Sequence, residues 1–285
     1  MGLLIGSPLM AQPYRFLFVS EGFQAQERNE YERIANRMEK AVRGQIPFQG
    51  ASLEFERLFE ASSISGIPIR SRYDRASGQW KDGSPRGRTL LQTKIADGRY
   101  IIQISDYSAL KRLVEGYGKP VDNVIVIVNS REYGAGGNYS DSIPATAYHE
   151  SKGQISWADA QRHFRYGLTL ITDTSGPGVL LHELGHSVAN LGEEYFTPGY
   201  PYPGGVYSQY MARKDNVSEV ADPKRVKWAD LMGVEGVGIF EGSDGFGRGL
   251  YRPWNDNCIM RRTESRKYCP VCRRSLERAL RNQSK

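Results

Sequence analysis

The motif that most constrains this chain is His-Glu-Leu-Gly-His at residues 182–186. Ser175-Gly-Pro-Gly178 precedes it and is typical of a helix start, because proline fits the first turn of a helix. At about 100° per residue, His182 and His186 share one face of this helix. Apolar residues occupy the opposite face: Leu180, Leu184, Val188 and Leu191. The chain therefore needs a fold that buries one face of the helix and leaves two imidazoles on the other.

Two imidazoles one helical turn apart can bind one Zn²⁺, with N–Zn distances of about 2.0–2.1 Å. Glu183 lies beside them and can accept a proton from a water molecule on the metal. The chain has only four histidines, and two of them lie in this motif. The motif predicts a catalytic zinc site with His182 and His186 as ligands and Glu183 as general base. The alternative interpretation is a polar helix surface that binds no metal.

Catalytic zinc usually takes three protein ligands and leaves one position open. In a continued helix, Glu193 would face the same side as His182, but about 16 Å further along the axis. The chain must therefore turn back, and Asn190 or Gly192 can adopt the left-handed conformation that this turn needs. We expect Glu193 to be the third ligand. Glu194 is the alternative, and a more distant ligand is a third possibility.

The rest of the chain predicts an α/β domain, because strands and helices alternate along it. Residues 14–20, 55–61, 99–104 and 167–172 are predicted strands, and residues 24–42 and 106–116 are predicted helices. The continuous apolar run at residues 123–129 is typical of a buried, parallel central strand. Residues 71–98 predict a long hairpin or surface loop. The glycine-rich run at 133–137 lacks the lysine of a phosphate-binding loop and predicts a turn.

The 285 residues suffice for one domain with a large core. We expect a single catalytic domain over residues 14–285. Residues 1–13 would form an N-terminal arm or the remnant of a signal peptide, since they lack the basic start of a complete one. We expect a secreted, periplasmic or cell-surface monomer. No apolar run reaches the roughly 18–20 residues of a membrane span.

The net charge of +6 comes from one segment of the chain. Residues 261–285 hold nine basic and two acidic side chains and carry +7, so the remaining residues sum to −1. The chain is thus a neutral body with one basic segment, not a basic protein, and a run of charge is usually a solvated face. We therefore expect no nucleic-acid partner.

The chain has three cysteines: Cys258, Cys269 and Cys272. The last two form a Cys-x-x-Cys motif, and a complete zinc ribbon would need a fourth cysteine that the chain lacks. We expect the three cysteines to have a structural role. Either Cys258 joins a disulfide, or the cysteines belong to a second zinc site with mixed ligands.

Five segments together resemble a known family. They are FVSEGFQAQE (18–27), VIVIVNSREYGAGG (124–137), HELGHSVANLGEEY (182–195), EGSDGFGRGLYRP (241–253) and CIM…CPVC (258–272). The chain resembles the immunoglobulin A peptidase family of metzincin-like zinc metallopeptidases. Members usually carry Asp-Glu-Tyr after the zinc helix, where this chain has Glu193. They also usually carry Gly-Asp-Gly-Tyr where this chain has Ser20-Glu-Gly-Phe23.

The resemblance implies a metzincin-like α/β domain with a mixed twisted sheet and an active-site helix. It implies a zinc endopeptidase with a polypeptide substrate, and Met260 as the methionine of the turn beneath the zinc. In the similar archaemetzincin branch, the Cys-x-Met and Cys-x-x-Cys motifs help to bind a second zinc, but one of those cysteines is missing here. The alternatives are a zinc hydrolase acting on a non-protein amide and an inactive zinc-binding module.

A peptidase also needs a donor to the oxyanion that forms from the peptide carbonyl. The candidates in this sequence are Tyr251 and Arg262, together with Tyr195 and Arg252.

Overall fold

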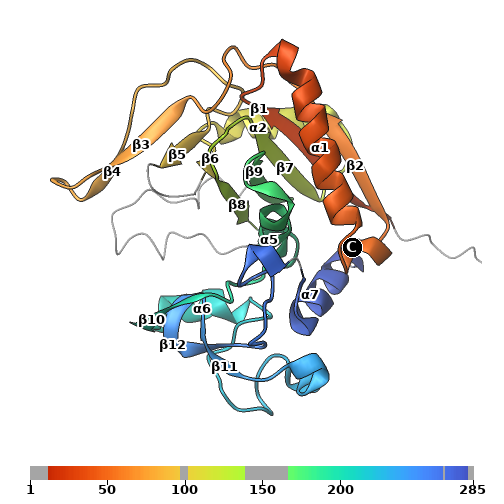
Figure 1. Ribbon diagram of the computed structural model, residues 1–285, viewed down its shortest axis with the longest axis vertical. Helices are drawn as coiled ribbons and strands as arrows, with labels where there is room; N and C mark the ends of the chain where they lie inside the picture. The colour runs from red at the N-terminus through yellow and green to blue at the C-terminus, as the bar shows by residue number, and fades with distance from the viewer. Residues whose placement is uncertain (1–11, 97–101, 139–165, 266, 282–285) are drawn as a thin grey trace, which may run out of the picture.

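The computed structural model describes residues 12–96, 102–138, 166–265 and 267–281. Its centre is a five-stranded sheet with the strand order β2-β1-β7-β9-β8 (Figure 1). The strands are β1 (Tyr14–Glu21), β2 (Leu53–Leu58), β7 (Asn123–Val128), β8 (Ala135–Asn138) and β9 (Gly167–Thr172). Four of them run parallel, and the edge strand β8 is antiparallel to β9. The protein is thus a mixed α/β fold.

The central strand β7 is buried on both faces because helices cover both sides of the sheet. Ile125 and Ile127 pack into one core with the helices α1 (Arg28–Arg43) and α5 (Gly176–Ala189). Val124 and Val126 point the other way, into a second core with α2 (Tyr107–Tyr117). The alternation along the strand explains why its sequence is a continuous apolar run, as predicted.

Two smaller sheets extend the fold. One has the order β4-β3-β5-β6, formed by β3 (Ile69–Asp74), β4 (Gln79–Asp82), β5 (Lys94–Ala96) and β6 (Ile102–Gln103). The other has the order β10-β12-β11, formed by β10 (Phe196–Pro201), β11 (Phe240–Ser243) and β12 (Gly245–Arg252). The helices α6 (Val206–Ala212) and α7 (Pro270–Arg281) complete the later half of the chain. In Figure 1, α5 lies between the five-stranded sheet and these later elements.

Within the described ranges, short 3-10 turns connect these elements at Ala25–Glu27, Phe48–Gly50, Ala229–Leu231, Val234–Gly236 and Thr263–Ser265. No helix among the described residues is long and apolar enough to cross a membrane. Residues 1–11 of the expected N-terminal arm lie outside the described residues.

Most predicted elements occur where the local pattern placed them, and one prediction was wrong. Residues 99–101 of the predicted strand at 99–104 lie outside the described residues. The helix predicted at 106–116 is α2, and the side chain of Asp106 caps it by accepting a 2.8 Å hydrogen bond from the Ala109 amide. The predicted turn at 133–137 is largely the strand β8. The glycines of β8 can form a strand without side-chain packing, because backbone hydrogen bonds to β9 hold the strand in place. The predicted loop at 71–98 contains the β3–β4 hairpin, and β5 pairs with β3 in parallel.

A buried carboxylate joins the end of β1 to the segment at residues 89–93. Glu21 is fully buried, and its carboxylate accepts hydrogen bonds from both the amide and the hydroxyl of Thr93, at 3.1 and 2.9 Å. It accepts two more, from the Thr89 hydroxyl at 2.6 Å and the Leu91 amide at 2.8 Å. Because a buried charge is costly unless it is hydrogen-bonded, these four donors are what allow Glu21 to lie in the core.

We expect Glu21→Gln to lower the free energy of unfolding by about 1–3 kcal/mol, because the new amide group would face a donor and leave it unpaired. Urea unfolding followed by circular dichroism measures this change. Glu60→Gln is the matched control, since Glu60 is exposed at the end of the neighbouring strand. It should shift the free energy by less than about 0.5 kcal/mol. Equal unfolding midpoints for the two variants would contradict the role given to Glu21.

Candidate metal centre

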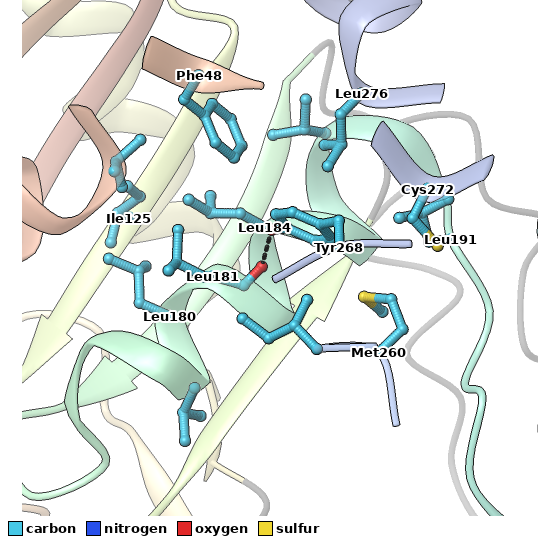
Figure 2. Close-up of a cluster of buried hydrophobic side chains, with 14 of the residues drawn as sticks. Phe48, Ile125, Leu180, Leu181, Leu184, Leu191, Met260, Tyr268, Cys272 and Leu276 are labelled. Carbon is cyan, nitrogen blue, oxygen red and sulfur yellow. Dashed lines mark hydrogen bonds between the residues drawn. The ribbon is translucent and has the colours of Figure 1, made fainter. Parts of the chain in front are cut away.

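The helix α5 is fixed by its apolar face. Leu180, Leu181 and Leu184 are buried in the core beneath the sheet, and Figure 2 shows them beside Tyr268 and Met260. The Tyr268 hydroxyl donates a hydrogen bond to the Leu181 carbonyl, which ties the helix to the segment before α7 (Figure 2). With this face buried, the helix carries the two histidines of the motif on another side.

The Met260 turn approaches α5 closely at Gly185. A Cβ atom built on Gly185 would lie 2.3 Å from the Met260 Sδ atom, which is closer than two such atoms can come. Both residues are buried, so a larger residue at 185 would have to push the turn away. The structure therefore places Met260 directly against the helix that carries the histidines.

A left-handed residue reverses the chain at the end of α5. Asn190 has φ 51° and ψ 35°, and its amide donates a 2.9 Å hydrogen bond to the His186 carbonyl. This is one of the two positions at which the sequence allowed such a turn. The reversal brings the Glu193 carboxylate back to the histidines, which a continued helix could not do.

Three side chains converge at this point. Glu193 Oε1 lies 3.1 Å from His186 Nε2, and Glu193 Oε2 lies 3.2 Å from His182 Nε2. The two Nε2 atoms are 3.2 Å apart. Ligands held 2.0–2.1 Å from a tetrahedral metal lie about 3.3 Å from one another. The spacing of the three donors therefore fits a single ion between them.

The backbone orients both imidazoles toward the same centre. His182 Nδ1 lies 2.9 Å from the Ile259 carbonyl oxygen, and His186 Nδ1 lies 2.6 Å from the Leu191 carbonyl oxygen. A carbonyl oxygen only accepts hydrogen bonds, so each Nδ1 carries a proton and Nε2 is the ring atom left to bind a metal. Metal-binding histidines are usually held in this way.

The electrostatics of the three residues also fit a bound cation. Glu193 Oε2 is buried and faces His182 Nε2, but it accepts no well-aligned hydrogen bond in the part of the chain that the structure describes. Burial raises the pKa of Glu193, but the two histidines outweigh it and hold the pKa below its ordinary value. Burial lowers the pKa of His182, but the charges of Glu193 and Glu183 outweigh it and raise the pKa to about 10. Negative charge thus dominates the environment of the imidazoles.

Glu183 lies between this centre and the edge strand β8. A Cβ atom built on Gly137 of β8 would lie 2.9 Å from Glu183 Oε2 and 2.4 Å from the Glu183 carbonyl oxygen. Glycine at this position therefore leaves room for the glutamate. Burial raises the pKa of Glu183, and the two nearby histidines only partly offset this.

The predicted oxyanion donors lie in different surroundings. The Tyr251 backbone pairs with Ser218 across an isolated bridge, and Arg262 is exposed. Arg252 is buried and donates hydrogen bonds to the Glu241 and Gly242 carbonyl oxygens. Among the described residues, none of these three side chains makes a hydrogen bond or ion pair with the histidines or Glu193.

Tyr195 is the predicted donor that lies at the centre. The charge of Glu193, followed by burial and by the charges of Asp244 and Glu183, raises the pKa of Tyr195. Its side chain is nevertheless about half exposed.

Glu194 does not face the histidines. Its side chain lies with Cys258, Cys269 and Cys272 in a second buried group, and the three cysteines are free. The sequence indicated that the cysteines belong together but gave no reason to add Glu194 to them. The available signal was its position beside Glu193, because adjacent residues outside a helix point in different directions.

The basic segment near the C-terminus is largely partnered. Three arginines of α7 form ion pairs with acidic residues of the 215–235 region: Arg273 with Glu235, Arg274 with Asp230, and Arg278 with Asp215. The local excess of positive charge is therefore partly neutralised by residues distant in the sequence.

Comparison with known protein families gives a match over most of the chain. The family model described as IgA Peptidase M64 matches residues 5–236 and 234–280. No curated protein matches the sequence. The family match confirms the resemblance seen in the sequence motifs. The chain therefore belongs to the IgA Peptidase M64 family, a family of peptidases.

Proposed function

We propose that the protein is a zinc-dependent metalloendopeptidase with a metzincin-like active site. The observation that carries the proposal is the convergence of His182, His186 and Glu193 within 3.1–3.2 Å, in a chain of a peptidase family. Two imidazoles and one carboxylate are a typical ligand set of catalytic zinc, which keeps its fourth position open for water or substrate. Met260, packed against Gly185, corresponds to the methionine turn expected beneath such a site.

Each residue of the motif has a distinct role in the proposed reaction. Bound zinc supplies Lewis acidity, which lowers the pKa of water to about 7 and favours negative charge on the scissile carbonyl oxygen. Glu183 accepts the proton of the attacking water and passes it to the leaving amine. The Ile259 and Leu191 carbonyl oxygens keep the imidazoles in the tautomer that binds the metal.

The position of β8 favours an extended polypeptide as substrate. In the described part of the chain, β8 is the edge strand of the large sheet and pairs only with β9. Glu183 lies directly against Gly137 of this strand. An extended peptide can pair with a strand edge through main-chain hydrogen bonds. A peptide bound along β8 would bring its backbone next to the proposed general base.

Tyr195 is the oxyanion donor that the structure favours, because it follows the Glu193–Glu194 segment and the charge of Glu193 is the main cause that raises the pKa of its phenol. When substrate is present, this hydroxyl can donate to the oxyanion beside the metal. Tyr251 and Arg262 remain the alternative donors.

We expect Glu183→Gln to bind zinc normally and to lose hydrolysis by a factor of about 10²–10⁴, because an amide cannot accept the proton of water. Zinc content by mass spectrometry and cleavage of a casein substrate measure the two properties. The control is Glu264→Gln, an exposed glutamate near the Met260 turn. Wild-type activity in Glu183→Gln would remove Glu183 from the mechanism.

We expect Tyr195→Phe to lower kcat by about 10²–10³ with little change in KM, because a donor to the oxyanion acts only in the transition state. Tyr251→Phe and Arg262→Gln, measured in parallel, should have much smaller effects. If one of these two variants shows the large loss instead, that residue is the donor.

We expect the zinc-loaded protein to cleave internal bonds of peptides blocked at both termini, because an edge strand accepts an extended chain on either side of the scissile bond. A mixture-based peptide library read by mass spectrometry detects such cleavage. Hydrolysis of small amides without peptide cleavage would indicate a non-protein amide hydrolase. Zinc binding without any hydrolysis would indicate an inactive zinc-binding module.

A further inference from the structure

A second group of buried side chains lies on the far side of the segment that carries Glu193. It consists of Glu194, Cys258, Cys269 and Cys272, all fully buried. Cys272 Sγ lies 3.1 Å and Cys269 Sγ 3.5 Å from Glu194 Oε1. The Sγ atoms of Cys258 and Cys272 are 4.0 Å apart. Four potential ligand atoms thus surround one point, and none of them belongs to the histidine centre.

The spacing of these atoms fits a bound metal better than a disulfide. Sulfur ligands at about 2.3 Å from a tetrahedral zinc lie about 3.8 Å from one another. A disulfide needs its two sulfurs about 2.05 Å apart. The 4.0 Å between Cys258 and Cys272 is close to the first value and far from the second.

One carboxylate oxygen of the group lacks a partner that a cation would provide. Glu194 Oε2 is buried with no hydrogen-bond partner in the described part of the chain. Backbone amides already donate to two sulfurs, from Cys269 to Cys258 at 3.3 Å and from Cys272 to Cys269 at 3.5 Å. Asn216 donates to Glu194 Oε1 at 3.2 Å, as outer-shell residues do for a ligand carboxylate. A carboxylate buried among three thiols is costly unless a positive charge compensates it.

We propose that Glu194, Cys258, Cys269 and Cys272 bind a second, structural zinc ion in a closed site of three sulfurs and one oxygen. Thiolate-rich tetrahedral sites select zinc, or iron in iron–sulfur proteins, over hard cations such as magnesium and calcium. The carboxylate of Glu194 takes the place of the fourth cysteine that the sequence lacks. This site is separate from the proposed catalytic centre and goes beyond the proposed function.

The second ion would join three segments that meet beneath α5. Glu194 directly follows Glu193, and its amide donates a 2.8 Å hydrogen bond to the Met260 carbonyl oxygen. Cys258 lies two residues before Met260, and Cys269 and Cys272 lie at the start of α7. The ion would therefore hold the Glu193 segment, the Met260 turn and α7 in a fixed arrangement.

The decisive experiment counts zinc ions per chain by inductively coupled plasma mass spectrometry. We expect two in the wild type, one in Cys272→Ser, one in His186→Ala and none in the double variant. Val271→Thr is the matched control, since Val271 is buried between Cys269 and Cys272 in the sequence but offers no ligand, and it should keep two ions. One ion in the wild type that is lost in His186→Ala and kept in Cys272→Ser would overturn the proposal.

Two further measurements on folded protein guard against a cysteine variant that does not fold. Cobalt bound to His186→Ala should show the near-ultraviolet charge-transfer absorption of sulfur–cobalt bonds, and its absence would overturn the proposal. A mercurial reagent added to the wild type should release one zinc as three thiols react. Release of no zinc, or detection of a Cys–Cys disulfide in the untreated chain, would also overturn it.

The His186→Ala count separates this proposal from the proposed function. If the catalytic centre binds no zinc, His186→Ala keeps the wild-type number of ions. If the second site binds no zinc, Cys272→Ser keeps the wild-type number of ions.

Discussion

The reversal of the chain at Asn190 is the constraint on which the candidate centre depends. The helix α5 can place two imidazoles on one side, but a straight helix cannot bring Glu193 to them, because that residue would lie about 16 Å along the axis from His182. Asn190 turns the chain back by adopting the left-handed conformation, which most residues with side chains disfavour. Once the chain has turned, the carbonyl of Leu191 orients His186 and the carboxylate of Glu193 reaches both histidines.

The reversal at Asn190 completes the centre only because the buried face of α5 fixes the positions of the two histidines. The leucines of its apolar face pack beneath the sheet, and Gly185 allows the Met260 turn to lie against the helix. The Ile259 carbonyl, one residue before Met260, then reaches His182. The same turn therefore contributes both packing and orientation, and the histidines owe their geometry to residues far from them in the sequence.

Local chemistry made the helix, the central strand and the reversal predictable from the sequence. The leucine spacing indicated α5, the apolar run indicated β7, and the small choice of residues able to turn the chain included Asn190. The family motifs placed Met260 near the histidines. Features that depend on pairing between distant segments were not predictable in this way. β8 was predicted to be a turn, because glycines carry no strand signal until a partner such as β9 is known.

The group around Glu194 shows the same limit. Three cysteines indicated a cluster, but its fourth member, Glu194, lies more than sixty positions earlier, and only the folded chain brings it there. The ion pairs of α7 are a further case, since the excess charge of one segment is balanced by acids that no local window contains. The partners of residues that act through long-range contacts can thus be found only in the structure. The roles of residues within one helix or strand can be predicted from their spacing in the sequence.

The adjacency of Glu193 and Glu194 has a mechanical consequence. A single planar peptide unit joins them, and this unit is one of the stiffest parts of any backbone. The Glu193 carboxylate faces the two histidines and the Glu194 carboxylate faces the three cysteines, so this one peptide unit links the two groups. A displacement of this peptide unit would therefore move the backbone from which both carboxylates extend.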